Sequence, residues 1–354
     1  MTQNLNHSTA SHRSPLLKLA LLVASTLATL LIAELSVRVM PVGPRYRAEG
    51  ALFNTLKMPQ NSLGYYDYEY DREKGPGVFR IMVVGDSFTE GAGLSFDDSF
   101  PKRLERYLNC FGNEQKITYQ VMNMSWHGRS TPKEVRLLKE YATQFHPDLV
   151  ILAYCLNDAE DLDVKDEIWR LKKLHPARLF KRPRGWKGVL YDHSALAKLI
   201  LRRTHITRNN RCYKRYYKEI YRDDYQGWKK TQEALLELGN LSRSYGIPAK
   251  VLIFPLFSHS LGDDYPFKRI HNKVHRALIK AGLPYIDLLP YYTNMNHIRL
   301  EYIPDKDPHP DEIAHRIAAE TLFRDLMQSG LLPGGKKLVG DVAFPQKSPH
   351  FVSD

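Results

Sequence analysis

The chain has 354 residues, of which 43% are hydrophobic and 25% are charged, and this composition excludes global disorder. The formal net charge of +12 suggests a polyanionic partner, but the whole excess lies within residues 161–230, where 20 Lys and Arg face 8 Asp and Glu. Outside that segment the charges cancel, so the basic character belongs to an insertion and not to the fold.

The first predicted element is an apolar helix that follows a polar tail at residues 1–14. Residues 15–33 read PLLKLALLVASTLATLLIA, which is long enough to cross a bilayer. A cleaved signal peptide is the main alternative, but no small-x-small cleavage site with a polar start follows the apolar run. We therefore expect an uncleaved transmembrane anchor over residues 15–36. Basic residues flank both ends, so a periplasmic or extracellular domain is a hypothesis.

Short apolar strands alternate with amphipathic helices after a linker over residues 37–78, which is rich in Pro, Gly and Tyr. Strands are expected at 79–84, 118–124, 148–153, 249–257 and 284–289, and helices at 99–108, 132–145, 228–245, 267–281 and 310–327. This alternation predicts an α/β fold with a parallel sheet and its ligand site at the carboxyl ends of the strands. The domain is expected over 79–330, followed by a flexible tail at 331–354.

The basic insertion at 161–230 includes RCYKRYYKEIYR, in which aromatic residues alternate with cations. Nucleic acid could stack on such a surface. We favour the alternative of a solvated helical cap whose tyrosines face the core, and we do not expect a nucleic-acid partner. The insertion could also shape the substrate entrance or contact anionic lipid or glycan.

Cysteines and paired histidines give little support for a metal site. Cys110, Cys155 and Cys212 form an odd set without close spacing, and Cys155 lies in an apolar run that predicts burial. A bridge between Cys110 and Cys212 stays open. His271 and His275 are four apart on a predicted helix, but no Glu stands between them, and a solvated helix face is favoured. We expect no metal and no cofactor.

Ser87 is the candidate nucleophile, because it follows the first strand in VVGDSFTEG, where a parallel sheet presents its reactive loops. A serine needs a base to become a nucleophile. Taken alone, a serine at this place is more often a helix cap or a turn residue.

His309 is the candidate base. It stands in YIPDKDPHPDEIAH, expected as a polar loop before the last helix, which returns to the same edge of the sheet. An imidazole can take a hydroxyl proton when a carboxylate holds its other ring nitrogen. Asp307 and Asp305 are the local carboxylates.

Three groups could stabilise an oxyanion beside Ser87. Asn157 and Asp158 end the third strand, and Gly128 lies in the loop after the second. The Asn157 amide and the backbone N–H groups of Gly128 and Ser87 could converge on one oxygen. Each residue alone could equally be a turn residue.

Four short motifs occur together in the chain order of the SGNH (GDSL-type) hydrolases. GDSFTEG with Ser87 resembles the first block, the loop with Gly128 the second, LND with Asn157 the third and DPHP with His309 the last. The motifs span residues 79–322. The resemblance implies a flavodoxin-like three-layer α/β/α sandwich and ester hydrolysis or acyl transfer without a metal.

The last motif departs from the common pattern, which has Asp three residues before His where this chain has Lys306. Asp307 fits the shorter Asp-x-His variant. The apolar span, followed by AELSVR and a tyrosine-rich linker, looks like that of bacterial membrane-anchored members.

The expected function is hydrolysis of a short-chain or acetyl ester through an acyl-serine intermediate, with Ser87, His309 and Asp307 as the catalytic set. The substrate would be an acyl ester, on a glycan or a lipid. One alternative is an O-acyltransferase acting on a cell-envelope polysaccharide. The other is a non-catalytic envelope binding protein, because a fold can outlive its chemistry.

Overall fold

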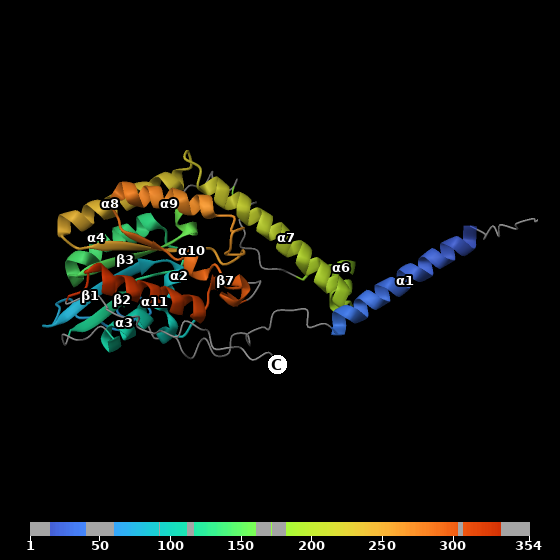
Figure 1. Ribbon diagram of the computed structural model, residues 1–354, viewed down its shortest axis with the longest axis horizontal. Coiled ribbons are helices and arrows are strands. Elements are labelled where there is room, and N and C mark those ends of the chain that lie inside the picture. Colours follow the sequence, from blue (N-terminus) through green and yellow to red (C-terminus); the bar gives the residue numbers. More distant parts are fainter. Residues whose placement is uncertain are drawn as a thin grey trace, which may run out of the picture. The chain divides into compact units, whose positions relative to one another are not determined.

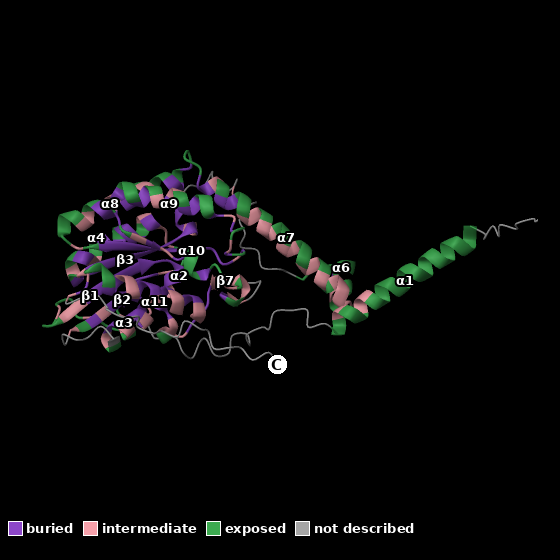
Figure 2. Ribbon diagram, viewed as in Figure 1, coloured by how far each residue is buried: buried purple, intermediate pink, exposed green. Residues whose placement is uncertain are grey.

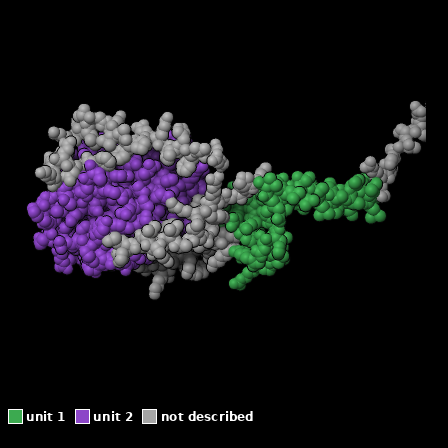
Figure 3. All heavy atoms as spheres, turned by 90° about the horizontal axis from the view of Figure 1, so that it is seen from below, with its two compact units in different colours: residues 1–44, 179–208 green, residues 45–178, 209–354 purple. Residues whose placement is uncertain are grey.

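A computed structural model describes residues 15–39, 60–91, 93–111, 117–160, 171, 182–303 and 307–333. The chain divides into two compact units (Figure 3). The first unit includes the described residues 15–39 and 182–208, and the second includes the rest.

A five-stranded parallel sheet forms the centre of the second unit. Its strands are β1 (Val78–Gly85), β2 (Thr118–Asn123), β3 (Leu149–Cys155), β4 (Ala249–Phe254) and β5 (Tyr285–Asp287), in the order β2-β1-β3-β4-β5. This is the flavodoxin-like order that the resemblance implies. Every residue of β3 and β4 is buried, as expected for strands that are covered on both faces. The predicted fold is confirmed.

Helices cover both faces of the sheet (Figure 1). On one face lie α4 (Thr131–Phe145), α8 (Gln226–Tyr245) and α9 (Lys268–Ala281), and on the other lie α3 (Phe100–Phe111) and α11 (Glu312–Ser329). Shorter elements are α2 (Ser87–Glu90), α10 (Leu289–Tyr292), η1 (Phe96–Asp98), η2 (Leu156–Ala159) and η3 (His297–Arg299). Buried apolar side chains fill the layers between the helices and the sheet (Figure 2).

The segment around His309 differs from the predicted polar loop. It forms a two-stranded antiparallel sheet of β6 (Glu301–Ile303) and β7 (Asp307–Pro310), so His309 lies on a strand. The last helix starts at Glu312 and not at Pro310, because the Asp311 side chain accepts hydrogen bonds from the N–H groups of Ile313 and Ala314.

The helices in the described part of the first unit are α1 (Pro15–Val39), α6 (Trp186–His193) and the first part of α7 (Ala195–Ile220). Helix α1 is exposed along its length (Figure 2) and has a window with a mean hydropathy of 2.2. Among the described helices it alone is long and apolar enough to cross a membrane. A membrane anchor and a signal sequence both have these properties.

Tyrosines of the insertion face the core of the second unit, as predicted. Tyr216, Tyr217 and Tyr221, at the end of α7, are buried among apolar side chains. Their rings are therefore not available as a stacking surface for nucleic acid. The cysteines are all free, with Cys155 buried as expected.

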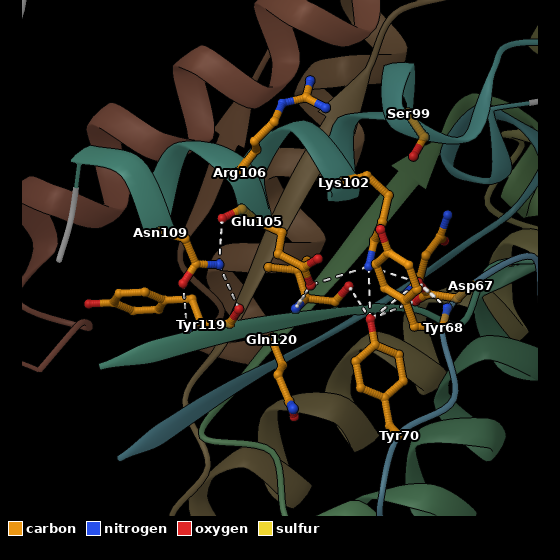
Figure 4. A network of polar contacts seen from close by, with 12 residues as sticks. Asp67, Tyr68, Tyr70, Ser99, Lys102, Glu105, Arg106, Asn109, Tyr119 and Gln120 are labelled. Atoms are coloured by element: carbon orange, nitrogen blue, oxygen red, sulfur yellow. Dashed lines mark hydrogen bonds and ion pairs between the residues drawn. The ribbon is translucent and has the colours of Figure 1, made fainter. Parts of the chain in front are cut away.

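Residues 60–77, from the expected linker, belong to the second unit and are joined to helix α3 by a buried ion pair (Figure 4). Lys102 Nζ on α3 lies 2.8 Å from an Asp67 carboxylate oxygen, and both side chains are 2% exposed. Asp67 also accepts a hydrogen bond from the N–H of Asn123 at 2.6 Å. Lys102 further donates to the Tyr70 hydroxyl at 2.8 Å and lies 5.1 Å from the centre of the Tyr68 ring. The pair fastens this segment to the sheet.

We expect Lys102→Met to reduce the free energy of unfolding by about 3–5 kcal/mol, because it leaves the Asp67 carboxylate buried without its cation. Urea unfolding monitored by circular dichroism measures the loss. Arg106→Met is the control: this residue of the same helix pairs with Asp97 at 3.7 Å in an exposed position, and its loss should cost less than about 1 kcal/mol. Equal losses in the two variants would contradict the role of the Lys102 pair.

Candidate active site

Ser87 opens helix α2, directly after strand β1. The cap of this helix is Asp86, whose carboxylate accepts a hydrogen bond from the Phe88 N–H at 2.9 Å. The alternative in which Ser87 is the cap is therefore wrong. Glycine is required at position 85, just before Asp86 and Ser87, because a Cβ there would lie 2.2 Å from Thr89 Oγ1. The tight turn places the Ser87 hydroxyl at the carboxyl end of strand β1, next to the central strand β3.

The Ser87 hydroxyl meets the imidazole of His309, a residue 222 positions away in the sequence. His309 Nε2 lies 2.9 Å from Ser87 Oγ. The other ring nitrogen, Nδ1, hydrogen bonds to the Asp307 carboxylate, which also accepts from the backbone N–H of His309 at 3.2 Å. Asp305, the reserve candidate, and Lys306 lie outside the described residues. An imidazole held in this way can remove a proton from the hydroxyl.

In His309 and Asp307 the interaction between the two side chains outweighs the effect of burial on each pKa. Burial disfavours the charged imidazolium, but the hydrogen bond and charge of Asp307, with the charges of Asp86 and Glu90, raise the pKa of His309 above 6.5. Burial also raises the pKa of Asp307, but the hydrogen bonds and charge of His309 outweigh it and lower that pKa below 3.8. Asp307 is therefore a carboxylate at neutral pH, and His309 becomes a neutral base only as the pH rises.

Asn157 joins the site through Asp86. It lies in η2, just after β3, and its Nδ2 donates a hydrogen bond to Asp86 Oδ2 at 2.7 Å. An amide nitrogen carries two hydrogens, so one remains for a second acceptor. Asp86 thus caps the helix of Ser87 and orients Asn157 at the same time.

The loop that carries Gly128 is tied to the loop that carries Ser87. The Trp126 N–H donates to the Gly85 carbonyl at 3.1 Å, and the His127 N–H donates to Glu90 Oε2 at 3.0 Å. Gly128 follows directly, exposed and with a φ of +72°, a value that favours glycine. These bonds hold the expected second motif beside the first.

Comparison with protein families gives a match over residues 83–317, to the GDSL-like lipase/acylhydrolase family. The chain belongs to this family. It is thus an ester hydrolase of the SGNH type, and the match spans all four motifs that carry the resemblance. A comparison with curated proteins found no significant match.

Solved structures similar to this GDSL-like hydrolase are distant in sequence. TesA is 16% identical with a TM-score of 0.42, covering 72% of this chain and 99% of TesA. Axe2, an acetylxylan esterase from Geobacillus stearothermophilus, is 13% identical with a TM-score of 0.44, covering 70% and 94%. The esterase EstA from Pseudoalteromonas sp. is 13% identical with a TM-score of 0.40, covering 71% and 97%. Likenesses of this size give no information about the substrate.

Three residues of the GDSL-like site were not identified from the sequence: Asp86, Glu90 and His127. The capping role of Asp86 could have been predicted from the sequence, since Asp is a preferred residue before the first turn of a helix. Glu90 ends helix α2 and His127 lies in the loop after β2, and no local pattern relates them.

Two further carboxyls, Glu134 and Asp158, are buried close to Asp86. Burial raises the pKa of both well above the ordinary values; the charge of Asp86 raises both pKa values further, and the charge of Glu134 also raises that of Asp158. Asp158 accepts hydrogen bonds from the Thr131 hydroxyl at 3.1 Å and from the Cys155 N–H at 3.2 Å. These shifts favour the uncharged form of both acids near Asp86.

One set of described residues has the donor spacing of a metal site: His271, His275 and Asp287, whose ligand atoms lie within 4.8 Å of one another. His271 Nδ1 and His275 Nε2 lie 2.9 Å and 2.8 Å from Asp287 Oδ2. The predicted solvated face is wrong for His271, which is 2% exposed. The set could hold a divalent cation. As placed, it forms a hydrogen-bonded link between α9 and β5.

Proposed function

We propose that this GDSL-like hydrolase is a membrane-anchored serine esterase that cleaves acyl esters through an acyl-Ser87 intermediate. The observation that carries the proposal is the line of contacts from Ser87 Oγ through His309 to Asp307, with 2.9 Å between Oγ and Nε2. This is the arrangement that a hydroxyl needs to act as a nucleophile.

In the first half of the reaction, His309 Nε2 takes the Ser87 proton as Oγ attacks the ester carbonyl carbon. The carbonyl π electrons move to oxygen, and the resulting oxyanion accepts hydrogen bonds from the N–H groups of Ser87 and Gly128 and from Asn157 Nδ2. Each such donor contributes about 3–4 kcal/mol in the transition state. The C–O bond to the leaving group then breaks, and the imidazolium returns its proton to the departing alkoxide.

In the second half, His309 removes a proton from water as the water oxygen attacks the acyl carbon. The bond to Ser87 Oγ breaks, and Oγ recovers the proton from the imidazolium. Asp307 stays ionised throughout, because its role is to orient the ring and to stabilise the imidazolium. The products are a carboxylic acid and the free alcohol.

A short acyl group suits the packing behind the nucleophile. Phe88, the residue after Ser87, is buried, and its ring packs against those of Phe254 and Phe257 and has its centre 5.4 Å from that of His309. Buried aromatic rings therefore lie beside the pair formed by Ser87 and His309. We therefore propose acetyl or another short-chain ester as the substrate.

Helix α1 supports an anchor because it is apolar and has no buried residue, and we propose that it places the catalytic domain outside the cytoplasm. A membrane-impermeant fluorophosphonate probe tests both proposals. We expect it to label Ser87 in the purified, folded chain, and also in intact spheroplasts that express it.

The outcomes separate the two proposals. Absence of label on the purified protein would exclude Ser87 as an activated nucleophile. Labelling of purified protein and of lysed but not intact spheroplasts would keep the esterase and contradict the outward orientation. Alkaline carbonate extraction of the labelled protein into the soluble fraction would contradict the anchor.

A further inference from the structure

Helix α6 presents an apolar stripe to solvent. Trp186, Val189 and Leu190 are 69%, 57% and 46% exposed, and their spacing of three and four residues places them on one helix face. Ile200, on the following helix α7, is also 52% exposed. Tryptophan concentrates where bilayers meet water, because its ring is apolar and its N–H is polar. The stripe therefore has the composition of an interfacial membrane helix.

The same region carries much of the positive charge of the chain. Residues 182–208, here called the basic module, contain seven Lys and Arg and one acidic residue, Asp192, giving a net charge of +6. Lys187 is exposed beside the stripe, with Nζ 5.5 Å from the centre of the Trp186 ring, and Lys198 is exposed on α7. Cations around an apolar stripe match an anionic lipid surface.

A set of hydrogen bonds holds the basic module at the end of the apolar helix α1. The Glu34 carboxylate accepts from the Ser194 hydroxyl at 2.8 Å and from the N–H groups of Ala195 and Leu196 at 2.8 and 2.9 Å. It therefore caps the N-terminus of α7, where an anion is favoured. Arg38 adds a bond to the His193 carbonyl at 2.9 Å.

The hydrogen bonds of Glu34 and Arg38 determine where the basic module would lie relative to a bilayer. Glu34 directly follows the apolar run that ends at Ala33, so it would stand at the membrane surface if α1 crosses the bilayer. The turn between α6 and α7 is hydrogen-bonded to that point. The basic module would then stay close to the membrane surface, because one point of it is bonded to a residue at that surface.

We propose that the basic module is a second membrane contact, which lies on anionic lipid beside the anchor with Trp186, Val189 and Leu190 in the headgroup layer. The inference rests on the proposed anchor. In this proposal the positive charge of the basic module binds the negative charge of anionic lipid headgroups. Nucleic acid is the other polyanion, and the apolar stripe favours lipid because a nucleic-acid surface would leave Val189 and Leu190 in water.

The test uses the full chain with Cys110 and Cys212 changed to Ser and an environment-sensitive fluorophore on Val189→Cys. The protein is placed in nanodiscs of phosphatidylcholine, alone or mixed with phosphatidylglycerol. We expect blue-shifted emission and quenching by brominated acyl chains in the anionic discs. The control label is at Tyr245→Cys, 49% exposed on α8, and should stay water-like. Lys187→Glu with Lys198→Glu should lower the ratio of docked to undocked label at least about five-fold per cation.

Each outcome has one meaning. A chain that elutes with the discs while the label at 189 stays water-like in both lipids contradicts the second contact and leaves the anchor standing. A chain that does not enter discs contradicts the anchor and the inference together. Displacement of the label from lipid by added single-stranded RNA would assign the module to nucleic acid. If the label itself disturbs the stripe, bromolipid quenching of wild type compared with Trp186→Phe gives the same answer.

Discussion

Ser87→Ala is expected to lower kcat for p-nitrophenyl acetate by about 10⁵–10⁶-fold, because it removes the hydroxyl that contacts His309 Nε2 and would form the acyl intermediate. The loss should not come from unfolding. Among the residues that the structure describes, the Ser87 side chain hydrogen bonds to His309, and removing such a bond costs about 1 kcal/mol. Stopped assays with product quantified by absorbance, beside a thermal melt, separate the two effects.

The matched control is Ser99→Ala. Ser99 is also buried, but its hydroxyl donates to the Phe96 carbonyl at 3.0 Å and does not contact His309. We expect turnover within about two-fold of wild type, since the change spares every group in the proposed mechanism. Undiminished turnover in Ser87→Ala would reject Ser87 as the nucleophile.

Asp307→Asn should lower kcat by about 10³–10⁴-fold while the protein stays folded, because an amide can hold the imidazole in the wrong tautomer and cannot stabilise the imidazolium. The pH profile gives a second readout. In the wild type, activity should rise with pH with an inflection above 6.5, since only neutral His309 can accept the serine proton and Asp307 raises the pKa of that ring.

In Asp307→Asn the residual activity should show its acid limb at lower pH than in the wild type, because the largest contribution that raises the pKa of His309 has been removed. Asp311→Asn is the control, since Asp311 caps α11 and lies outside the contacts of the ring, and Asn is also a good cap. A wild-type inflection below 6.5, or the same acid limb in Asp307→Asn, would contradict the assignment of Asp307.

The sheet could be predicted because its central strands are continuous apolar runs between helices of clear period. Strands β1, β3 and β4 are buried on both faces, so their sequences contain few polar residues. The hairpin of β6 and β7 escaped prediction because its strands are only three and four residues long and mix polar with apolar residues. At that length no period distinguishes a strand from a loop.

Long-range polar contacts were beyond prediction, because no local pattern relates their members. Lys102 and Asp67 are an example, as is the bond between Asn157 and Asp86. The burial of His271 is different. It stands three residues before Val274 and seven before Leu278, which both face the core, and this spacing already placed its ring on the buried side.

The candidate site residues could be proposed because they lie in short motifs at strand ends, where the fold gathers loops. The choice between Asp305 and Asp307 could not be made, since two carboxylates stood within four residues of one imidazole. Asp305 lies outside the described residues, and our proposal of Asp307 is supported by its hydrogen bond to the His309 ring on the same strand.

Strand β7 carries both the ring and its carboxylate two residues apart, so their partnership is assembled from a single stretch of four residues. Only the link to Ser87 depends on distant parts of the chain. A displacement of the hairpin should therefore separate His309 from the Ser87 hydroxyl while the contact between His309 and Asp307 is kept. Substitutions outside the hairpin that tilt it should abolish activity although Ser87, His309 and Asp307 are all still present.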